Sequence, residues 1–174
     1  MSVRDFSVQK EAGFKHPGKF KGLTESPQLN GQILGFDYLQ KLGITHVQLL
    51  PVYDFGSVDE ENQWKAYNWG YDPVQYNVPE GSYASDSNDP YARIWELQDA
   101  IATYHRANLS VIMDVVYNHV YQADEYAFEQ IVPGYFYRYN AEGERTNGTF
   151  CGNDVASERS MVRHYIKPVS YTHL

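Results

Sequence analysis

Apolar residues along the chain follow two different periods, and these predict helices and strands in alternation. Helical spacing links three apolar residues, and a glycine follows them as an expected helix end: Phe36, Leu39, Leu42 and Gly43. The run His46–Val52 is apolar without alternation, which is typical of a strand buried on both faces of a parallel sheet. The segment Val3–Phe6 is too short to assign from its pattern alone.

A second helix and the strongest strand signal follow in the middle of the chain. Asp89 and Pro90 suit the N-cap and the first position of a helix. Four residues at helical spacing predict its buried face: Ile94, Leu97, Ile101 and Tyr104. Asn108 is the expected stop, and Ser110–Val116 is the predicted strand that follows. A short helix is expected at residues 157–166.

The order of these elements predicts the fold class. Strands alternating with helices indicate an α/β fold with a parallel sheet and crossover helices on one face. We expect three consecutive parallel strands, at Val3–Phe6, His46–Val52 and Ser110–Val116. Two long loops, at residues 53–88 and 121–154, follow strands and therefore lie at the edge where such sheets bind ligands. The periods do not distinguish an open sheet from a closed barrel.

Composition narrows the classes of partner. The 174 residues are 43% hydrophobic and carry a formal net charge of −8, which suits a globular domain and argues against binding nucleic-acid phosphates. No apolar stretch is long enough to span a membrane. The single Cys151 excludes an internal disulfide and, alone, a thiolate metal site. No signal peptide is visible at Met1–Phe6, which favours the cytoplasm only if this is the natural N-terminus. The oligomeric state stays open.

A polar segment at the end of the last strand carries candidate chemistry. Asp114 ends an apolar run, and Asn118 and His119 follow where the strand gives way to its loop. A carboxylate at that edge costs free energy unless it is hydrogen-bonded, and functional groups are often placed there. A loop cap and a structural histidine explain the same residues equally well.

An aromatic segment inside the first long loop is the second candidate. Tyr67–Pro73 offers the ring faces of Trp69 and Tyr71 and a hydroxyl acceptor, Asp72. Gly70 lets the backbone turn sharply or approach a ligand closely. A tight turn whose rings cover the end of the sheet is the alternative interpretation.

Together the two segments resemble known signatures. Asp114–His119 resembles the first signature region of the α-amylase superfamily of glycoside hydrolases, and Tyr67–Pro73 resembles the signature of its type I pullulanases. Val3–Phe6 resembles the end of the first barrel strand there, and Asn147–Val162 resembles the segment after the histidine. The resemblance covers residues 3–166 and implies a partial (β/α)8 TIM barrel, with about its first three strand–helix units.

The resemblance implies that three residues bind substrate. Tyr71 would stack on the sugar at the cleavage subsite, and Asp72 would be a further substrate contact. His119 would hydrogen-bond a hydroxyl of that sugar, more tightly as the sugar ring distorts. The expected partner is therefore an α-glucan such as pullulan, branched starch or glycogen.

Three further residues would support the site. Asp114 would hold groups of the catalytic centre, among them an arginine, and Trp69 would add a ring face. Asn118 in many relatives orders the loop after the third strand, in some through a calcium ion. No cofactor is required by the chemistry, and no carboxylate cluster visible in the sequence supports a calcium site.

The implied activity is retaining hydrolysis of α-1,6-glucosidic bonds. It uses an Asp nucleophile and a Glu acid/base that are about 5 Å apart. In relatives both follow later strands, so we expect no catalytic carboxylate in this chain and place both beyond Leu174. Residues 3–166 would then be the N-terminal portion of a catalytic barrel, and the chain alone would be inactive. Residues 167–174 do not resemble the approach to a fourth strand and are interpreted as a non-native or frame-shifted tail.

Two other functions remain open. One is another α-amylase superfamily enzyme that acts on α-1,4-glucans, which Tyr67–Pro73 disfavours. The other is a non-catalytic glycan-binding fragment, which the incomplete sheet disfavours.

Overall fold

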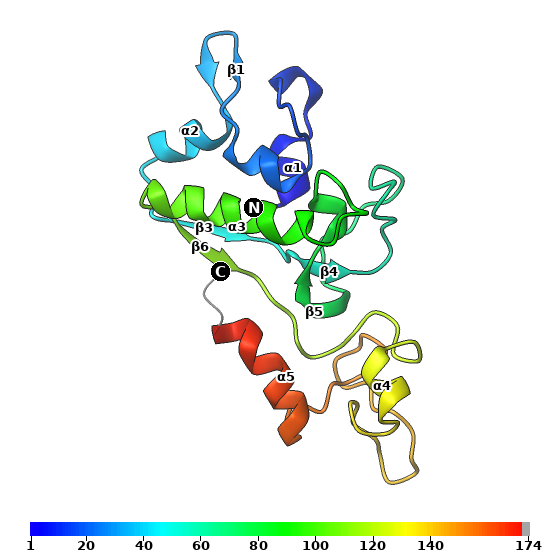
Figure 1. The fold of residues 1–174 in the computed structure, drawn as a ribbon. Coiled ribbons are helices and arrows are strands. Elements are labelled where there is room, and N and C mark those ends of the chain that lie inside the picture. Colours follow the sequence, from blue (N-terminus) through cyan, green and yellow to red (C-terminus); the bar gives the residue numbers. More distant parts are fainter. Residues whose placement is uncertain (172–174) are drawn as a thin grey trace.

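In the computed structural model, two parallel strands lie side by side in the larger part of the molecule (Figure 1). Strand β3 (His46–Leu49) pairs with β6 (Ser110–Met113), and each residue of β3 has a partner in β6. The crossover between them contains helix α3 (Ala92–Arg106), which packs against β6. The predicted parallel pairing of these strands is confirmed. Both end earlier than predicted, and Pro51 has no N–H group to extend β3.

Local sequence explains the two helices of this part. Helix α2 (Gly35–Lys41) ends before Gly43, whose φ of 69° is left-handed. Asp89 Oδ1 accepts a backbone N–H group at 2.9 Å before α3, and Asn108, with φ of 58°, follows its end. The inward face of α3 is buried as predicted at three positions: Leu97, Ile101 and Tyr104. Ile94 was predicted to be buried but is 37% exposed, because it lies in the first turn of the helix.

The N-terminal segment differs from the prediction. Val3–Ser7 forms a short helix, α1, so the strand predicted at Val3–Phe6 is wrong. Ser2 caps this helix by accepting a hydrogen bond from the Asp5 backbone N–H, at 3.2 Å. The backbone that lies beside β3 is that of Met1, whose carbonyl accepts the Leu50 N–H at 2.9 Å.

The first long loop contains a second, antiparallel pair of strands. β4 (Tyr53–Phe55) pairs with β5 (Pro73–Pro79), and the 3-10 helix η3 (Gly81–Tyr83) follows. The register shifts on both sides of Asp54. Because of this irregularity, the order of polar and apolar residues does not indicate that the two segments pair. Residues 53–88 are therefore more regular than the sequence predicted.

The remaining elements are short or lie in the smaller part of the molecule. The elements between α1 and α2 are η1 (Lys10–Ala12), η2 (Phe20–Thr24), β1 (Gln28–Leu29) and β2 (Gln32–Ile33). The smaller part holds α4 (Ala127–Ile131) and α5 (Ser160–Tyr171). In Figure 1, α3 and α5 lie on opposite sides of β6, so the prediction that the helices share one face is wrong.

The structure describes the backbone of residues 1–171 and the side chains of residues 1–167. Helix α5 continues past its predicted end at Ile166, and the last residues of the predicted non-native tail, 172–174, lie outside the described residues. Within that described range no helix is both long and apolar enough to cross a membrane.

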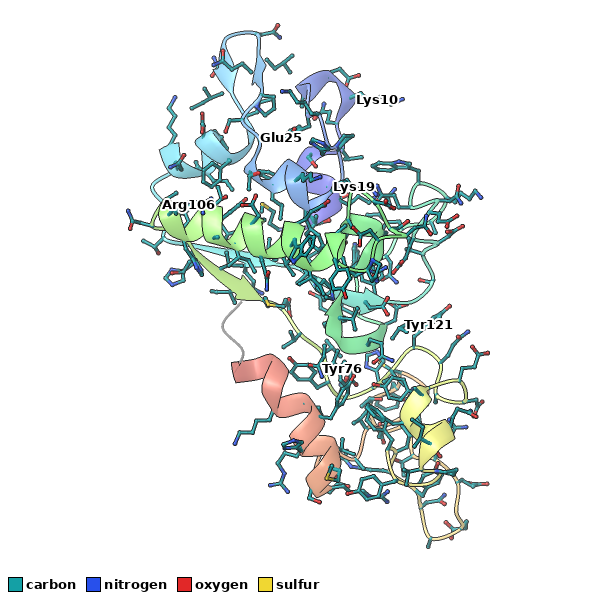
Figure 2. All side chains as sticks on the ribbon, viewed as in Figure 1. Lys10, Lys19, Glu25, Tyr76, Arg106 and Tyr121 are labelled. Atoms are coloured by element: carbon teal, nitrogen blue, oxygen red, sulfur yellow. The ribbon has the colours of Figure 1, made fainter. Side chains whose placement is uncertain are left out.

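Two apolar clusters hold these parts together. The larger joins α1, η2, α2, α3 and the β3–β6 pair, and its members include Val3, Phe20, Leu23, Leu49, Leu97 and Tyr104. The smaller is mostly aromatic and lies among β5, α4 and α5, with Tyr76, Tyr126, Phe136 and Tyr137. Tyr76 of β5 lies where the two parts meet (Figure 2), so β5 is shared between them.

Candidate functional site

The two candidate segments meet beyond the carboxyl ends of β3 and β6. The Tyr71 hydroxyl donates to Asp114 Oδ2 at 2.7 Å, although 43 residues separate them in the chain. Gln48 Nε2 lies 3.3 Å from the same oxygen. The hydrogen bond to Asp114 raises the pKa of the Tyr71 phenol, which therefore stays protonated and donates. Asp114 is thus satisfied by its neighbours at the strand end.

His119 lies against the turn that contains Tyr71. Its ring Nδ1 is 2.7 Å from Asn118 Oδ1, and the ring is 8% exposed. Burial lowers the pKa of His119, while a hydrogen bond with the Tyr71 backbone and the charge of Asp72 act in the other direction. Because its pKa is lowered, the histidine is neutral near neutral pH.

A buried tyrosine hydrogen-bonds the backbone of the histidine. The Tyr76 hydroxyl donates to the His119 carbonyl oxygen at 2.7 Å. Tyr76 is 2% exposed and belongs to β5, directly after the Tyr71 turn. The two candidate segments are therefore connected through β5 as well as through Asp114.

Asn68 shapes the aromatic turn, a role that the sequence analysis missed. Its side-chain nitrogen donates to Asp72 Oδ1 at 2.5 Å and to the Gly56 carbonyl at 2.6 Å, and its oxygen accepts the Gly70 N–H at 2.8 Å. Gly70 has φ of 92°, and a Cβ there would lie 2.9 Å from Pro51 Cβ. An Asn two residues before a Gly is a turn signal that the sequence contained.

Two of the predicted site residues, Trp69 and Asp72, differ in their exposure to solvent and in their hydrogen bonds. Trp69 is 63% exposed, so its ring is open to a ligand. Asp72 is partly engaged by Asn68 and by Ser57 Oγ at 3.3 Å, and burial raises its pKa. The roles assigned to Trp69, Tyr71, Asp72, Asp114, Asn118 and His119 stay predictions, and the structure brings their segments together.

A loop later in the chain, around Asn153 and Asp154, is hydrogen-bonded to the backbone of the segment that contains His119. Asn153 Oδ1 accepts the Val120 N–H at 3.0 Å, and its Nδ2 donates to the Val120 carbonyl at 2.8 Å. The Val155 N–H donates to the Asn118 carbonyl at 2.9 Å. The neighbouring Asp154 carboxylate orders this loop through three hydrogen bonds of 2.6 to 2.8 Å. This loop belongs to the run Asn147–Val162, whose resemblance to the family implies no particular role.

Replacing Asp154 with Asn is expected to lower the free energy of unfolding by about 2 kcal/mol, because the charge-assisted bonds from Thr146, Gly148 and Thr149 are weakened. Burial opposes its ionisation, yet these bonds lower the pKa of Asp154 to about 2. Because the folded pKa is depressed, the contribution is present above the ordinary carboxyl pKa and disappears as the pH falls towards about 2.

Urea unfolding at neutral and acidic pH measures this difference. The exposed Asp99→Asn on α3 is the matched control. A difference between the Asp154 variant and the wild type that persists unchanged in acid would contradict the assignment.

Calcium is the one metal that the family resemblance raises. Asn118 Oδ1 is hydrogen-bonded with His119. Among the described residues, the acidic side chains that lie close enough together to share a metal ion are elsewhere, at Asp54, Glu60 and Glu80. No pattern in the sequence indicates that these three carboxylates meet. Arg93 donates to both oxygens of Glu60, so the residues present do not fit a divalent cation.

Comparison with known proteins places the chain in a family. Residues 15–138 match the alpha-amylase catalytic domain family. The pullulanase of Bacillus subtilis strain 168 is 50% identical over 166 residues, which are 94% of this chain and 23% of that protein. The chain thus spans about a quarter of the length of this relative.

Solved structures agree with this assignment. A Paenibacillus barengoltzii pullulanase in complex with maltohexaose and alpha-cyclodextrin superposes with a TM-score of 0.94 at 50% identity, over 98% of this chain and 27% of that one. An Anoxybacillus pullulanase in complex with maltotriose gives a TM-score of 0.90 at 52% identity, over 95% of this chain and 24% of that one. The chain therefore belongs to the alpha-amylase catalytic domain family, and over nearly its whole length it is similar to pullulanases.

Proposed function

We propose that the chain is part of a starch- and glycogen-debranching enzyme that hydrolyses α-1,6-glucosidic bonds of α-glucans with retention of configuration. The observation that carries this proposal is the convergence of Tyr71, Asp114 and His119 on one edge of the parallel strands. Relatives named pullulanases, similar over nearly the whole chain, support the same reaction. Solved pullulanases in complex with malto-oligosaccharides support α-glucan as the ligand.

In this proposal the described residues bind and position the sugar. Tyr71 presents a ring that its bond to Asp114 holds in one orientation, and Trp69 offers a second, exposed ring. Neutral His119 hydrogen-bonds a sugar hydroxyl. The nucleophile and the acid/base would come from later strands of the barrel, so the chain supplies only the binding half of the site.

The proposal also assigns the strands. β3 and β6 would be the second and third strands of a (β/α)8 barrel, and the backbone at Met1, which pairs with Leu50, would end the first. The β4–β5 pair would then be an insertion after the second strand that carries the aromatic turn. This assignment explains why both candidate segments lie at the carboxyl edge.

A chimeric enzyme tests the reaction. This chain would replace the matching segment of the Bacillus subtilis pullulanase, to which it is 50% identical. We expect the chimera to release maltotriose from pullulan and to leave linear α-1,4-glucan uncut. Cleavage of amylose in preference to pullulan would favour an α-1,4-acting enzyme. Malto-oligosaccharide binding by a folded chimera without hydrolysis would favour a glycan-binding role.

Tyr71→Ala in the chimera is expected to weaken binding of maltotriose roughly tenfold, because stacking of the ring is lost. Tyr71→Phe keeps the ring, loses the bond to Asp114, and should retain most of the affinity. Titration calorimetry measures both, with Tyr38→Ala on the exposed surface of α2 as control. Equal losses in the Ala and Phe variants would mean that the hydroxyl, rather than the ring face, binds the sugar.

A further inference from the structure

Three carboxylates from separate segments meet beside the first turn of α3. Asp54 lies in β4, Glu60 in the next loop and Glu80 just after β5, and one oxygen of each lies within 4.8 Å of the others. Glu80 is fully buried, and its two oxygens accept the backbone N–H groups of Phe55 and Ser82 at 3.0 and 2.8 Å. Three carboxylates at this spacing supply part of the six to eight oxygen ligands that a calcium ion takes.

The negative charge of this group needs compensation. Burial, and next the charge of Glu60, raise the pKa of Asp54 to about 6. Burial also raises the pKa of Glu80 to about 7, against the hydrogen bonds that its oxygens accept. Carboxylates this close repel one another when ionised, and each is costly to bury without a partner. A cation among them relieves both costs.

Arg93 provides a cation at this place. Its Nη1 and Nη2 donate to the two oxygens of Glu60 at 3.0 and 2.6 Å, a bidentate ion pair. Nη2 also lies 3.2 Å from the Ser87 carbonyl, and Nη1 lies 3.4 Å from that of Pro79. The Arg93 side chain is 13% exposed, and its charge lowers the pKa of Asp54. One guanidinium thus joins the loop after β4, the end of β5 and α3.

The backbone leaves room for this ion pair. A Cβ on Gly81 would lie 2.2 Å from the Glu60 carboxyl carbon and 2.3 Å from Arg93 Nη2. Any side chain at this position would therefore push the pair apart. The arrangement depends on four residues from four segments, which is more than a surface ion pair.

We propose that Arg93 is a built-in counter-ion that stands where Asp54, Glu60 and Glu80 would otherwise require a bound divalent cation. The guanidinium fixes the β4–β5 pair to α3 and so makes the aromatic turn independent of metal. This inference concerns stability and metal dependence, and it holds whether or not the proposed debranching reaction is correct.

Arg93→Met tests the counter-ion, because Met keeps the apolar stem and removes the charge. With a chelator present, the thermal unfolding midpoint of the variant chain should fall by roughly 10 °C. Millimolar calcium should restore most of this loss, because the three carboxylates then bind the ion. The wild-type midpoint should be the same in chelator and in calcium.

Two further variants complete the experiment. Arg106→Met lies at the opposite end of α3 (Figure 2), where its guanidinium contacts Thr103 Oγ1, and should neither lose stability nor respond to calcium. Arg93→Lys keeps a charge but loses the bidentate pair. Its unfolding midpoint should therefore lie between those of the wild type and Arg93→Met, and it should be insensitive to calcium.

Two results would overturn the proposal. The first is a wild-type midpoint that rises with calcium, since the carboxylates would then bind metal beside Arg93. The second is an Arg93→Met midpoint that calcium does not change. If Arg93→Met is unfolded in chelator, refolding on addition of calcium supports the proposal, and failure to refold under those conditions counts against it.

Discussion

Pullulan incubated with the purified 174-residue chain is expected to yield no reducing sugar above background. The described residues place a tyrosine, a neutral histidine and a hydrogen-bonded aspartate at the site. Only one of these three residues is a carboxyl group. The retaining reaction needs two, one to form the glycosyl intermediate and one to protonate the leaving oxygen. The chimera with the Bacillus subtilis pullulanase should hydrolyse the same substrate.

The chain with His119→Ala is the control for this assay. Activity in the chain that disappears in this variant would mean that Asp54 or Asp72 acts as a catalytic carboxylate. The structure argues against both, since Asp54 faces the Arg93 ion pair and Asp72 is held by Asn68. A circular dichroism spectrum of the chain must accompany the assay, because an unfolded chain is inactive for a trivial reason.

The parts of the fold that were predicted correctly have local causes. The buried stripe of α3 and its stop at Asn108 can be read from spacing and from one residue that tolerates positive φ. The meeting of Tyr71 with Asp114 follows from a general rule, because loops after parallel strands reach the same edge. Neither prediction required knowledge of side-chain packing.

The parts that were missed depend on contacts between distant segments. At Val3–Ser7 the cap from Ser2 favours a helix, and only two apolar residues, Val3 and Phe6, oppose it. The carboxylates Asp54, Glu60 and Glu80 come together only because β4 pairs with β5 through an irregular register. Asn153 acts on Val120 across 33 residues, and no period in the sequence encodes such a contact.

His119→Ala in the chimera is expected to lower kcat about 100-fold while KM changes much less. A hydrogen bond to a sugar hydroxyl that strengthens as the ring distorts contributes mainly to the transition state, and removing one such donor costs roughly two orders of magnitude in rate. Burial lowers the pKa of His119, so the wild-type ring is neutral at the working pH and the loss should not depend on pH above neutrality.

Steady-state kinetics on pullulan measure both constants, and His105→Ala in the last turn of α3 is the matched control, since His105 is exposed and distant from the site. His119→Gln separates binding from structure, because an amide can still donate to a hydroxyl and should recover part of kcat. A rise in KM with kcat unchanged would mean that His119 binds substrate and transition state equally. Loss of both constants together with a lower unfolding midpoint would instead assign His119 to the support that Tyr76 and Asn118 build around it.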